Sequence, residues 1–185
     1  MLGSTVSRFR DPQRLPGMDV TTTHRVIDSP LGELTLVAQN GALTGLYFAD
    51  HVRRPGAGLL GRRVASGFDD AVGQLNAYFA GGQTGFDLLL AASGGPFERR
   101  VWTLLSTIPY GTTRSYADLA AELGDRRLAQ AVGAANARNP LCVIVPCHRL
   151  VGSDGSLTGY AGGLDRKRSL LRLEERSAVE AGRLF

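Results

Sequence analysis

The chain has 185 residues, of which 43% are hydrophobic, so it is long enough for one domain or two small ones with a buried core. Two cysteines are too few for a disulfide framework, and with three histidines at these spacings they do not make up a metal site of the usual kind, so we expect reduced thiols, an intracellular location and no metal. The net charge is +4 and all of the excess lies from Phe97 onward, which suits a partner that carries phosphates and equally suits a solvated basic face.

The first half of the chain predicts a small α+β domain over residues 21–92, with no evident chemistry. Residues 1–20 lack the apolar core of a secretory signal, and we expect them to be a flexible extension. Short β-like runs between His24 and Asp50 are separated by turn residues, of which Asn40–Gly41 is a strong hairpin signal. Apolar residues at helical spacing predict an amphipathic helix over 68–80, and the run FDLLLA that follows suits one more short strand.

The second half, residues 93–185, predicts mainly helices. One helix is expected over 97–107, a second over 116–123 with Ser115 as its cap, and a third over 126–137 with Asp125 as its cap. Two short helices joined by a tight turn are typical of a helix-turn-helix, although any helical hairpin gives the same pattern. The outer face of the last helix mixes small and basic residues, which suits close approach to a bulky partner and equally suits close helix packing.

The stretch IVPCHRLVG places a cysteine at the end of a β-branched run that we expect to be a buried strand ending at Pro146. A thiol attacks as the thiolate, which needs a base or a positive environment, and His148 is the next residue after Cys147. Neighbours on an extended chain point to opposite sides, so contact between them requires a turn or a short helix at the cysteine. Taken alone, the pair more often describes a buried thiol beside an incidental histidine.

A last helix, expected to be capped by Asp165, places Glu174 on the same face as Leu170 and Leu171. A carboxylate on that apolar face needs a partner, because an unpaired buried charge is costly. A histidine N–H would supply one and give a glutamate–histidine–water–cysteine relay. A glutamate that reaches solvent is the alternative.

These segments together resemble one protein family. The stretch IVPCHRLVG, with AVGAANARNP before it and GYAGGLDRKRSLLRLE after it, is similar to the bacterial O6-alkylguanine-DNA alkyltransferases, also called methylated-DNA–protein-cysteine methyltransferases. The resemblance is strong over Phe97–Glu175 and looser over SPLGELTL and LNAYFAG. It implies an α+β fold, in which a ribonuclease H-like domain precedes a mostly helical winged helix-turn-helix domain with the active site.

The activity that the resemblance implies is DNA repair by a suicide methyltransferase. The alkyl group of O6-alkylguanine, and also of O4-alkylthymine, would pass irreversibly to Cys147 in a single turnover with base flipping and no cofactor. The partner would be double-stranded DNA that contains alkylated guanine, bound without sequence specificity. The resemblance further implies a monomer that sits at the nucleoid of the bacterial cytoplasm and not at a membrane, and it allows cooperative binding to DNA.

Roles for individual residues follow from the resemblance alone. It implies that Cys147 accepts the alkyl group, that His148 is the base acting through water, that Glu174 orients the histidine, and that Asn139 braces the helix-turn-helix against the active-site segment. Tyr116 would press on the phosphate of the flipped nucleotide. The remaining DNA- and base-binding positions would be Tyr160 and Ala161 near O6, the carbonyls of Cys147 and Leu150 at the guanine amino group, Ser153 at the DNA backbone, and Asp125 and Gln130 on the helix-turn-helix.

The chain departs from the family pattern at two of these positions. Gln130 stands where the family usually has an intercalating arginine, so we expect weaker DNA binding or slower flipping. Ala161 stands where some relatives have serine, which leaves only backbone N–H groups near O6. Two alternatives from other classes keep the same thiol, namely a winged-helix regulator that senses alkylation or oxidation at Cys147 and a cysteine hydrolase.

Overall fold

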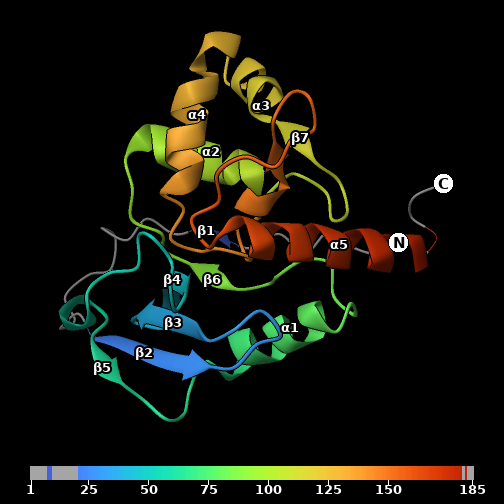
Figure 1. The fold of residues 1–185 in the computed structure, drawn as a ribbon. Helices are drawn as coiled ribbons and strands as arrows, with labels where there is room; N and C mark the ends of the chain where they lie inside the picture. Colours follow the sequence, from blue (N-terminus) through green and yellow to red (C-terminus); the bar gives the residue numbers. More distant parts are fainter. Residues whose placement is uncertain (1–7, 10–20, 181, 183–185) are drawn as a thin grey trace.

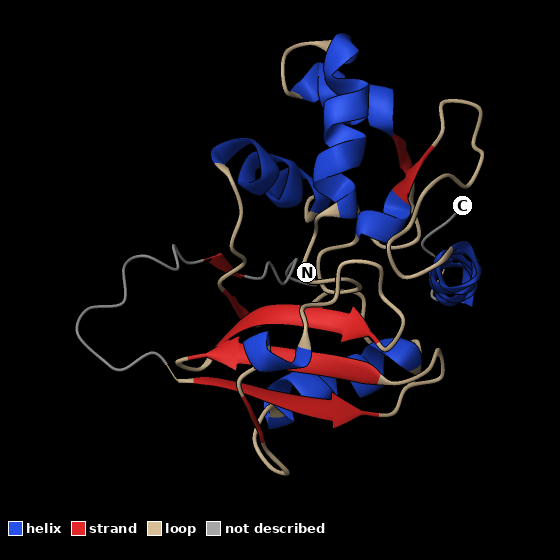
Figure 2. Ribbon diagram, turned by 60° about the vertical axis from the view of Figure 1, so that its left-hand side comes forward, coloured by secondary structure: helices blue, strands red, loops and turns tan. Residues whose placement is uncertain are grey.

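The computed structural model describes residues 8–9, 21–180 and 182, which build a sheet half and a helical half that pack on each other (Figure 1). Figure 2 shows most of the strands gathered in one half and most of the helices in the other. The main hydrophobic core runs through both halves, from Leu36 and Leu46 in the sheet to Leu105, Leu119 and Val132 in the helices. The two halves therefore share one packed interior.

The sheet half is a six-stranded sheet of order β1-β6-β4-β3-β2-β5. Its antiparallel centre is formed by β2 (Thr22–Ile27), β3 (Leu34–Gln39) and β4 (Ala42–Phe48), flanked by the two-residue strands β1 (Arg8–Phe9), β6 (Leu89–Leu90) and β5 (Arg62–Arg63). Asn40 and Gly41, with φ of 48° and 81°, form the predicted two-residue turn between β3 and β4.

Part of the expected extension belongs to this sheet. Arg8–Phe9 pair in parallel with Leu89–Leu90, where the sequence predicts a flexible segment, and the rest of residues 1–20 lies outside the described residues. The predicted helix over 68–80 is present as α1 (Asp69–Phe79). Leu75 and Tyr78 on its buried face are fully covered, so α1 contributes to the common core.

The helical half contains the predicted helix pair. Its elements are α2 (Pro96–Leu105), β7 (Arg114–Ser115), α3 (Tyr116–Glu122), the 3-10 turn η3 (Arg126–Leu128), α4 (Ala129–Ala137), the 3-10 turn η4 (Cys147–Arg149), β8 (Leu150–Val151) and α5 (Leu164–Glu180); one further 3-10 turn, η2 (Ala57–Leu59), lies in the sheet half. The Ser115 hydroxyl accepts the backbone N–H of Asp118 and caps α3, as expected. Strands β7 and β8 pair in parallel as a small wing.

Three sequence-based expectations were wrong in detail. The helix expected over 126–137 starts as a 3-10 turn, so Asp125 caps η3 rather than an α-helix. Asp165 lies inside the first turn of α5, exposed and paired with Arg168, and does not cap the helix. The run Leu141–Val145 is a series of buried turns with a bridge from Leu141 to Leu46, because the N–H groups of Ile144 and Val145 bond to carbonyls of the same run.

These buried turns are held in an unusual backbone conformation. Val143 has φ of 70°, which a β-branched residue rarely adopts. The Leu46 N–H of β4 donates to the Pro140 carbonyl, and the Cys142 thiol donates to the Leu46 carbonyl. The sheet half thus fixes the segment that leads to Cys147.

Among the described helices, none combines the length and the apolar character needed to cross a membrane.

Candidate active site

The predicted nucleophile and its neighbour lie on the 3-10 turn η4. Cys147 is 4% exposed and His148 is fully buried. The turn begins after Pro146, and the Arg149 N–H closes it by donating to the Pro146 carbonyl. Contact between the cysteine and the histidine requires a turn at this point, as the sequence predicts, and the structure has that turn.

Glu174 is fully buried on α5 and accepts five hydrogen bonds. His148 Nε2 donates to Oε1 over 2.9 Å, and Arg149 donates from Nη2 to Oε1 and from Nε to Oε2 over 2.8 and 2.9 Å. The Tyr78 hydroxyl donates to Oε1 over 2.6 Å, and the Gly111 N–H donates to Oε2 over 3.1 Å. The inward-facing glutamate expected from helical spacing is therefore present, with more partners than expected.

The backbone of Gly111 can approach α5 because it lacks a side chain. A Cβ at this position would lie 2.8 Å from the Cβ of Ala178, and the φ of Gly111 is 75°.

The ionised form of Glu174 is stabilised by its partners. Burial alone would raise the pKa of Glu174, but His148 and Arg149 hold it well below its usual value.

The partners of Glu174 fix the tautomer of His148. An ionised carboxylate only accepts, so Nε2 carries the imidazole proton and Nδ1 carries the lone pair. Nδ1 is buried and bonds to no protein group in the described part of the chain, so it is available as a base. Burial lowers the pKa of His148, and it raises the pKa of the Cys147 thiol against the opposing influence of Asn139, Lys167 and Tyr160. The resting site is therefore a neutral thiol beside a neutral imidazole.

Two asparagines tie the end of α4 to the active-site segment. Asn139, which we predicted as a brace, donates from Nδ2 to the Val145 carbonyl over 2.9 Å and accepts the Leu141 N–H over 3.0 Å. Asn136 was not predicted, and its Nδ2 donates to the carbonyl of Cys147 itself over 3.3 Å. It precedes Asn139 by three residues, so the helical repeat could have placed both on one face.

Lys167 is a buried cation of the site that was not predicted from the sequence. Its Nζ donates to the carbonyls of Leu150 and Thr158 and lies 5.9 Å from the centre of the Tyr116 ring. Burial lowers the pKa of Lys167 to about 8. Lys167 precedes Glu174 by seven residues on α5, and this two-turn spacing was the signal available in the sequence.

Comparison with known proteins decides the family. Residues 96–176 match the family model described as 6-O-methylguanine DNA methyltransferase, DNA binding domain, and residues 23–92 match the model of its ribonuclease-like domain. The chain belongs to the 6-O-methylguanine DNA methyltransferase family. The family predicted from the sequence is confirmed, as are the α+β fold and the assignment to the methyltransferases of DNA repair.

Relatives in this family are similar over nearly their whole length. The methylated-DNA–protein-cysteine methyltransferase of Mycolicibacterium paratuberculosis is 48% identical over 162 residues, which are 88% of this chain and 98% of the relative. The enzyme of the same name from Methanosarcina barkeri is 45% identical, over 81% of this chain and 95% of the relative. The crystal structure of Mycobacterium tuberculosis OGT in complex with DNA superposes with a TM-score of 0.81 at 48% identity, over 84% of this chain and 94% of the other.

The methyltransferase fold places the predicted base-contacting residues in two settings. Tyr160 is buried beside Cys147, and Tyr116 is half-buried near the thiol and Lys167. Ala161 is partly buried, and its carbonyl accepts the Val52 N–H over 3.1 Å from the sheet half. Gln130 lies exposed on α4, and Ser153 lies exposed on the loop after β8. Asp125 is partly buried just before η3.

The carbonyls expected to receive the guanine amino group already have partners. Asn136 donates to the Cys147 carbonyl and Lys167 donates to the Leu150 carbonyl. A carbonyl oxygen has two lone pairs, so each can accept one more hydrogen bond. The two predicted contacts therefore stay compatible with the geometry.

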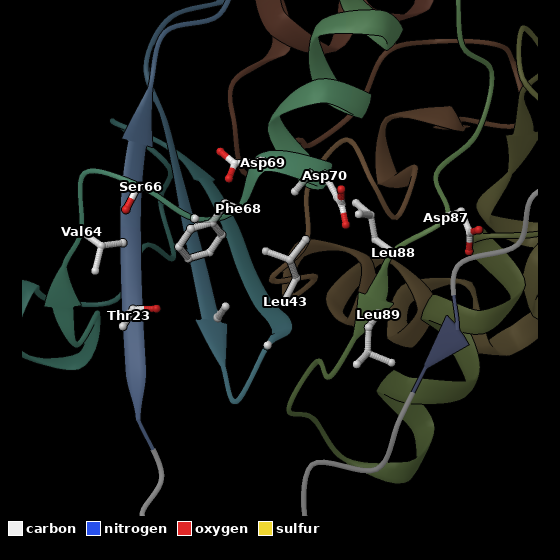
Figure 3. A pocket seen from close by; sticks show the side chains of 14 residues that line it. Thr23, Leu43, Val64, Ser66, Phe68, Asp69, Asp70, Asp87, Leu88 and Leu89 are labelled. Atoms are coloured by element: carbon white, nitrogen blue, oxygen red, sulfur yellow. The ribbon is translucent and has the colours of Figure 1, made fainter.

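A cavity of about 520 Å³ in the methyltransferase lies elsewhere, between the sheet and the start of α1 (Figure 3). Its lining includes Leu43, Phe68, Asp70 and Asp87, and it includes no residue of the site around Cys147. Within the described ranges, no three His, Cys, Asp or Glu side chains are grouped as a metal site requires.

Proposed function

We propose that this protein repairs alkylated DNA by transferring the alkyl group from O6 of guanine to Sγ of Cys147, once per molecule. The observation that carries the proposal is the buried contact of 2.9 Å between His148 Nε2 and Glu174 Oε1, next to a thiol that is itself buried. Because Nε2 carries the proton in this contact, the lone pair of His148 Nδ1 is the base for the thiol proton.

The reaction is an in-line displacement at the alkyl carbon. The thiol proton passes to Nδ1 of His148, through a water where one bridges them, and Sγ forms a bond to the alkyl carbon while the bond from that carbon to O6 breaks. The electron pair of the broken bond remains on guanine, which then takes up a proton. The Tyr160 hydroxyl is buried beside the thiol and interacts with it, so it lies where it can donate to the leaving base. Tyr116 is the second candidate donor.

Burial of the acceptor favours base flipping. Cys147 is 4% exposed and Tyr160 is 9% exposed, so a base stacked inside duplex DNA does not come within bonding distance of Sγ. We therefore propose that the target nucleotide leaves the stack and that Tyr116 and the outer face of α4 support this movement. Duplex DNA would be bound without sequence preference, since the exposed face of α4 offers mainly small side chains to the base edges. Thymine alkylated at O4 carries the same alkyl–oxygen bond and is included in the proposal.

A thioether gives no easy leaving group, so the alkylated thiol stays alkylated and each molecule acts once. The second cysteine does not take over the reaction, because Cys142 is fully buried and its thiol donates to the Leu46 carbonyl. Burial raises the pKa of Cys142 well above its usual value, which keeps it a structural thiol.

The test is to incubate the protein with a duplex oligonucleotide bearing O6-methylguanine and to measure the intact mass and the peptide masses. One added methyl group per protein is expected on Cys147, and it should be absent in Cys147→Ser and present in Cys142→Ser. Loss of the DNA methyl group with unmodified protein would indicate a hydrolase. Tight binding to one DNA sequence without repair would indicate a regulator, and either result would overturn the proposal.

A further inference from the structure

The sheet half contributes one hydrogen bond to the buried carboxylate of the site. Tyr78 lies on the covered face of α1, and its hydroxyl donates to Glu174 Oε1 over 2.6 Å. The other donors to Glu174, namely Gly111, His148 and Arg149, all belong to the helical half. The contact spans 96 residues of sequence and is shorter than any of the others.

Tyr78 and His148 share the same carboxylate oxygen. Oε1 accepts from the Tyr78 hydroxyl, from His148 Nε2 and from Arg149 Nη2. The three donors compete for the electron density of one oxygen, so the strength of each bond depends on the other two. The hydroxyl of Tyr78 therefore affects both where Oε1 stands and how strongly it attracts the proton on His148.

The charge of Glu174 does not depend on Tyr78. Arg149 pairs with both carboxylate oxygens and supplies the neutralising charge in this buried setting. Tyr78 is neutral, and its ring is held by contacts with Phe79, Phe86 and Tyr110 at centroid distances of 5.5, 5.3 and 5.9 Å. Those ring contacts do not use the hydroxyl, so the hydroxyl can be removed while the packing stays.

We propose that Tyr78 is a positioning residue for alkyl transfer, which fixes Glu174 Oε1 and thereby sets the orientation and the basicity of His148. This inference rests on the proposed transfer to Cys147. It gives the sheet half, for which the sequence indicated no chemistry, a direct part in the active site.

Tyr78→Phe is the variant that isolates the hydroxyl. Without this donor, Oε1 attracts the His148 proton more strongly, which favours the protonated imidazole. The acid limb of the pH–rate profile therefore moves to higher pH, because protonation of the imidazole removes the base. The less firmly held carboxylate should also lower the rate of methyl transfer at least ~10-fold, the size expected for one hydrogen bond to a charged group.

The experiment measures methyl transfer in a single turnover across a range of pH. Wild type, Tyr78→Phe and Tyr47→Phe are each mixed with a saturating duplex oligonucleotide that bears O6-methylguanine, so that differences in DNA affinity do not enter the rate. Tyr47 is a buried tyrosine of β4 whose ring packs on His51, and it serves as the matched control. We expect the slower rate and the shifted acid limb in Tyr78→Phe alone.

A second measurement reads the contact without activity. The NMR signal of the His148 Nε2 proton should shift in Tyr78→Phe and stay in place in Tyr47→Phe. A slower Tyr78→Phe with an unmoved acid limb and an unmoved His148 signal would mean that the hydroxyl only stabilises the core, and the inference would be overturned. A wild-type rate and profile would overturn it as well. Failure of the proposed function is distinct, because wild type itself would then take up no methyl group.

Discussion

Glu174→Gln tests whether the carboxylate orients the imidazole. The substitution keeps the size of the side chain and removes its charge. Arg149 is 6% exposed and would lose the counter-ion that it contacts through Nε and Nη2. Removing one member of a buried ion pair costs about 3–5 kcal/mol, so the free energy of unfolding should fall by about that amount.

The geometry also decides which way the new amide points. An NH₂ group at the place of Oε2 would face the N–H groups of Arg149 and Gly111, both of which only donate. At the place of Oε1 it would face the Tyr78 hydroxyl and His148 Nε2, both of which can accept, and only Arg149 Nη2 would oppose it. The amide should therefore donate to Nε2, which moves the imidazole proton to Nδ1 and removes the base.

The expected result is a methyl-transfer rate at least ~100-fold lower, since a positioned general base contributes roughly 10²–10⁴. The assay is a single-turnover rate on saturating duplex DNA, with urea unfolding measured on the same samples. Glu175→Gln is the matched control, because Glu175 is the exposed neighbour on α5. A folded Glu174→Gln protein that reacts within about threefold of wild type would refute the orienting role.

Three further variants extend these expectations. Gln130→Arg restores a long cation on the exposed face of α4, so we expect tighter binding and faster repair of duplex DNA, with little change on single-stranded substrate; an equal or lower duplex rate would contradict this. Lys167→Met should change how stability depends on pH, because the pKa of Lys167 is about 8 in the folded state against an ordinary 10.5. The cost of burying this charge is present below pH 8 and disappears as the pH rises toward 10.5. Across that range the free energy of unfolding of wild type, measured with denaturant, should therefore rise by on the order of 2–3 kcal/mol relative to the variant. A parallel pH dependence in the two proteins would argue against a buried charge. Asn136→Ala should slow methyl transfer about threefold to tenfold by freeing the Cys147 carbonyl, and a wild-type rate would show that this bond is dispensable.

Much of the site could be predicted because its signals are local. The helical repeat alone places Glu174 beside Leu170 on the covered face of α5, and the burial of both agrees with it. The Asn40–Gly41 turn and the Ser115 cap follow likewise from residues a few positions apart. In each case the physics that determines the structure acts within one or two turns of backbone.

The features that escaped prediction depend on distant parts of the chain. The Tyr78 hydroxyl meets Glu174 only because α1 and α5 pack together, and nothing near either residue indicates this. The β-branched run Leu141–Val145 has high strand propensity, but N–H groups of this run bond within the run and to the Asn139 side chain, and tertiary context overrides the propensity. Lys167 was hidden by its type, since a lysine is rarely buried without partners and its two carbonyl partners lie on the loop and strand before α5.

The left-handed backbone conformation of Val143, which lies before the active-site turn, has a consequence for the order of folding. A β-branched residue at φ of 70° costs about 1–3 kcal/mol, which the short-range bonds from Ile144 to Cys142 and from Val145 to Leu141 offset in part. The long-range offset comes from the bonds of Leu46 to Pro140 and Cys142, which close a loop of more than ninety residues. Contacts between such distant positions form after the local ones. The turn that presents the thiol should accordingly be among the last parts of the molecule to reach its final shape, and the first to lose it when the sheet half is weakened.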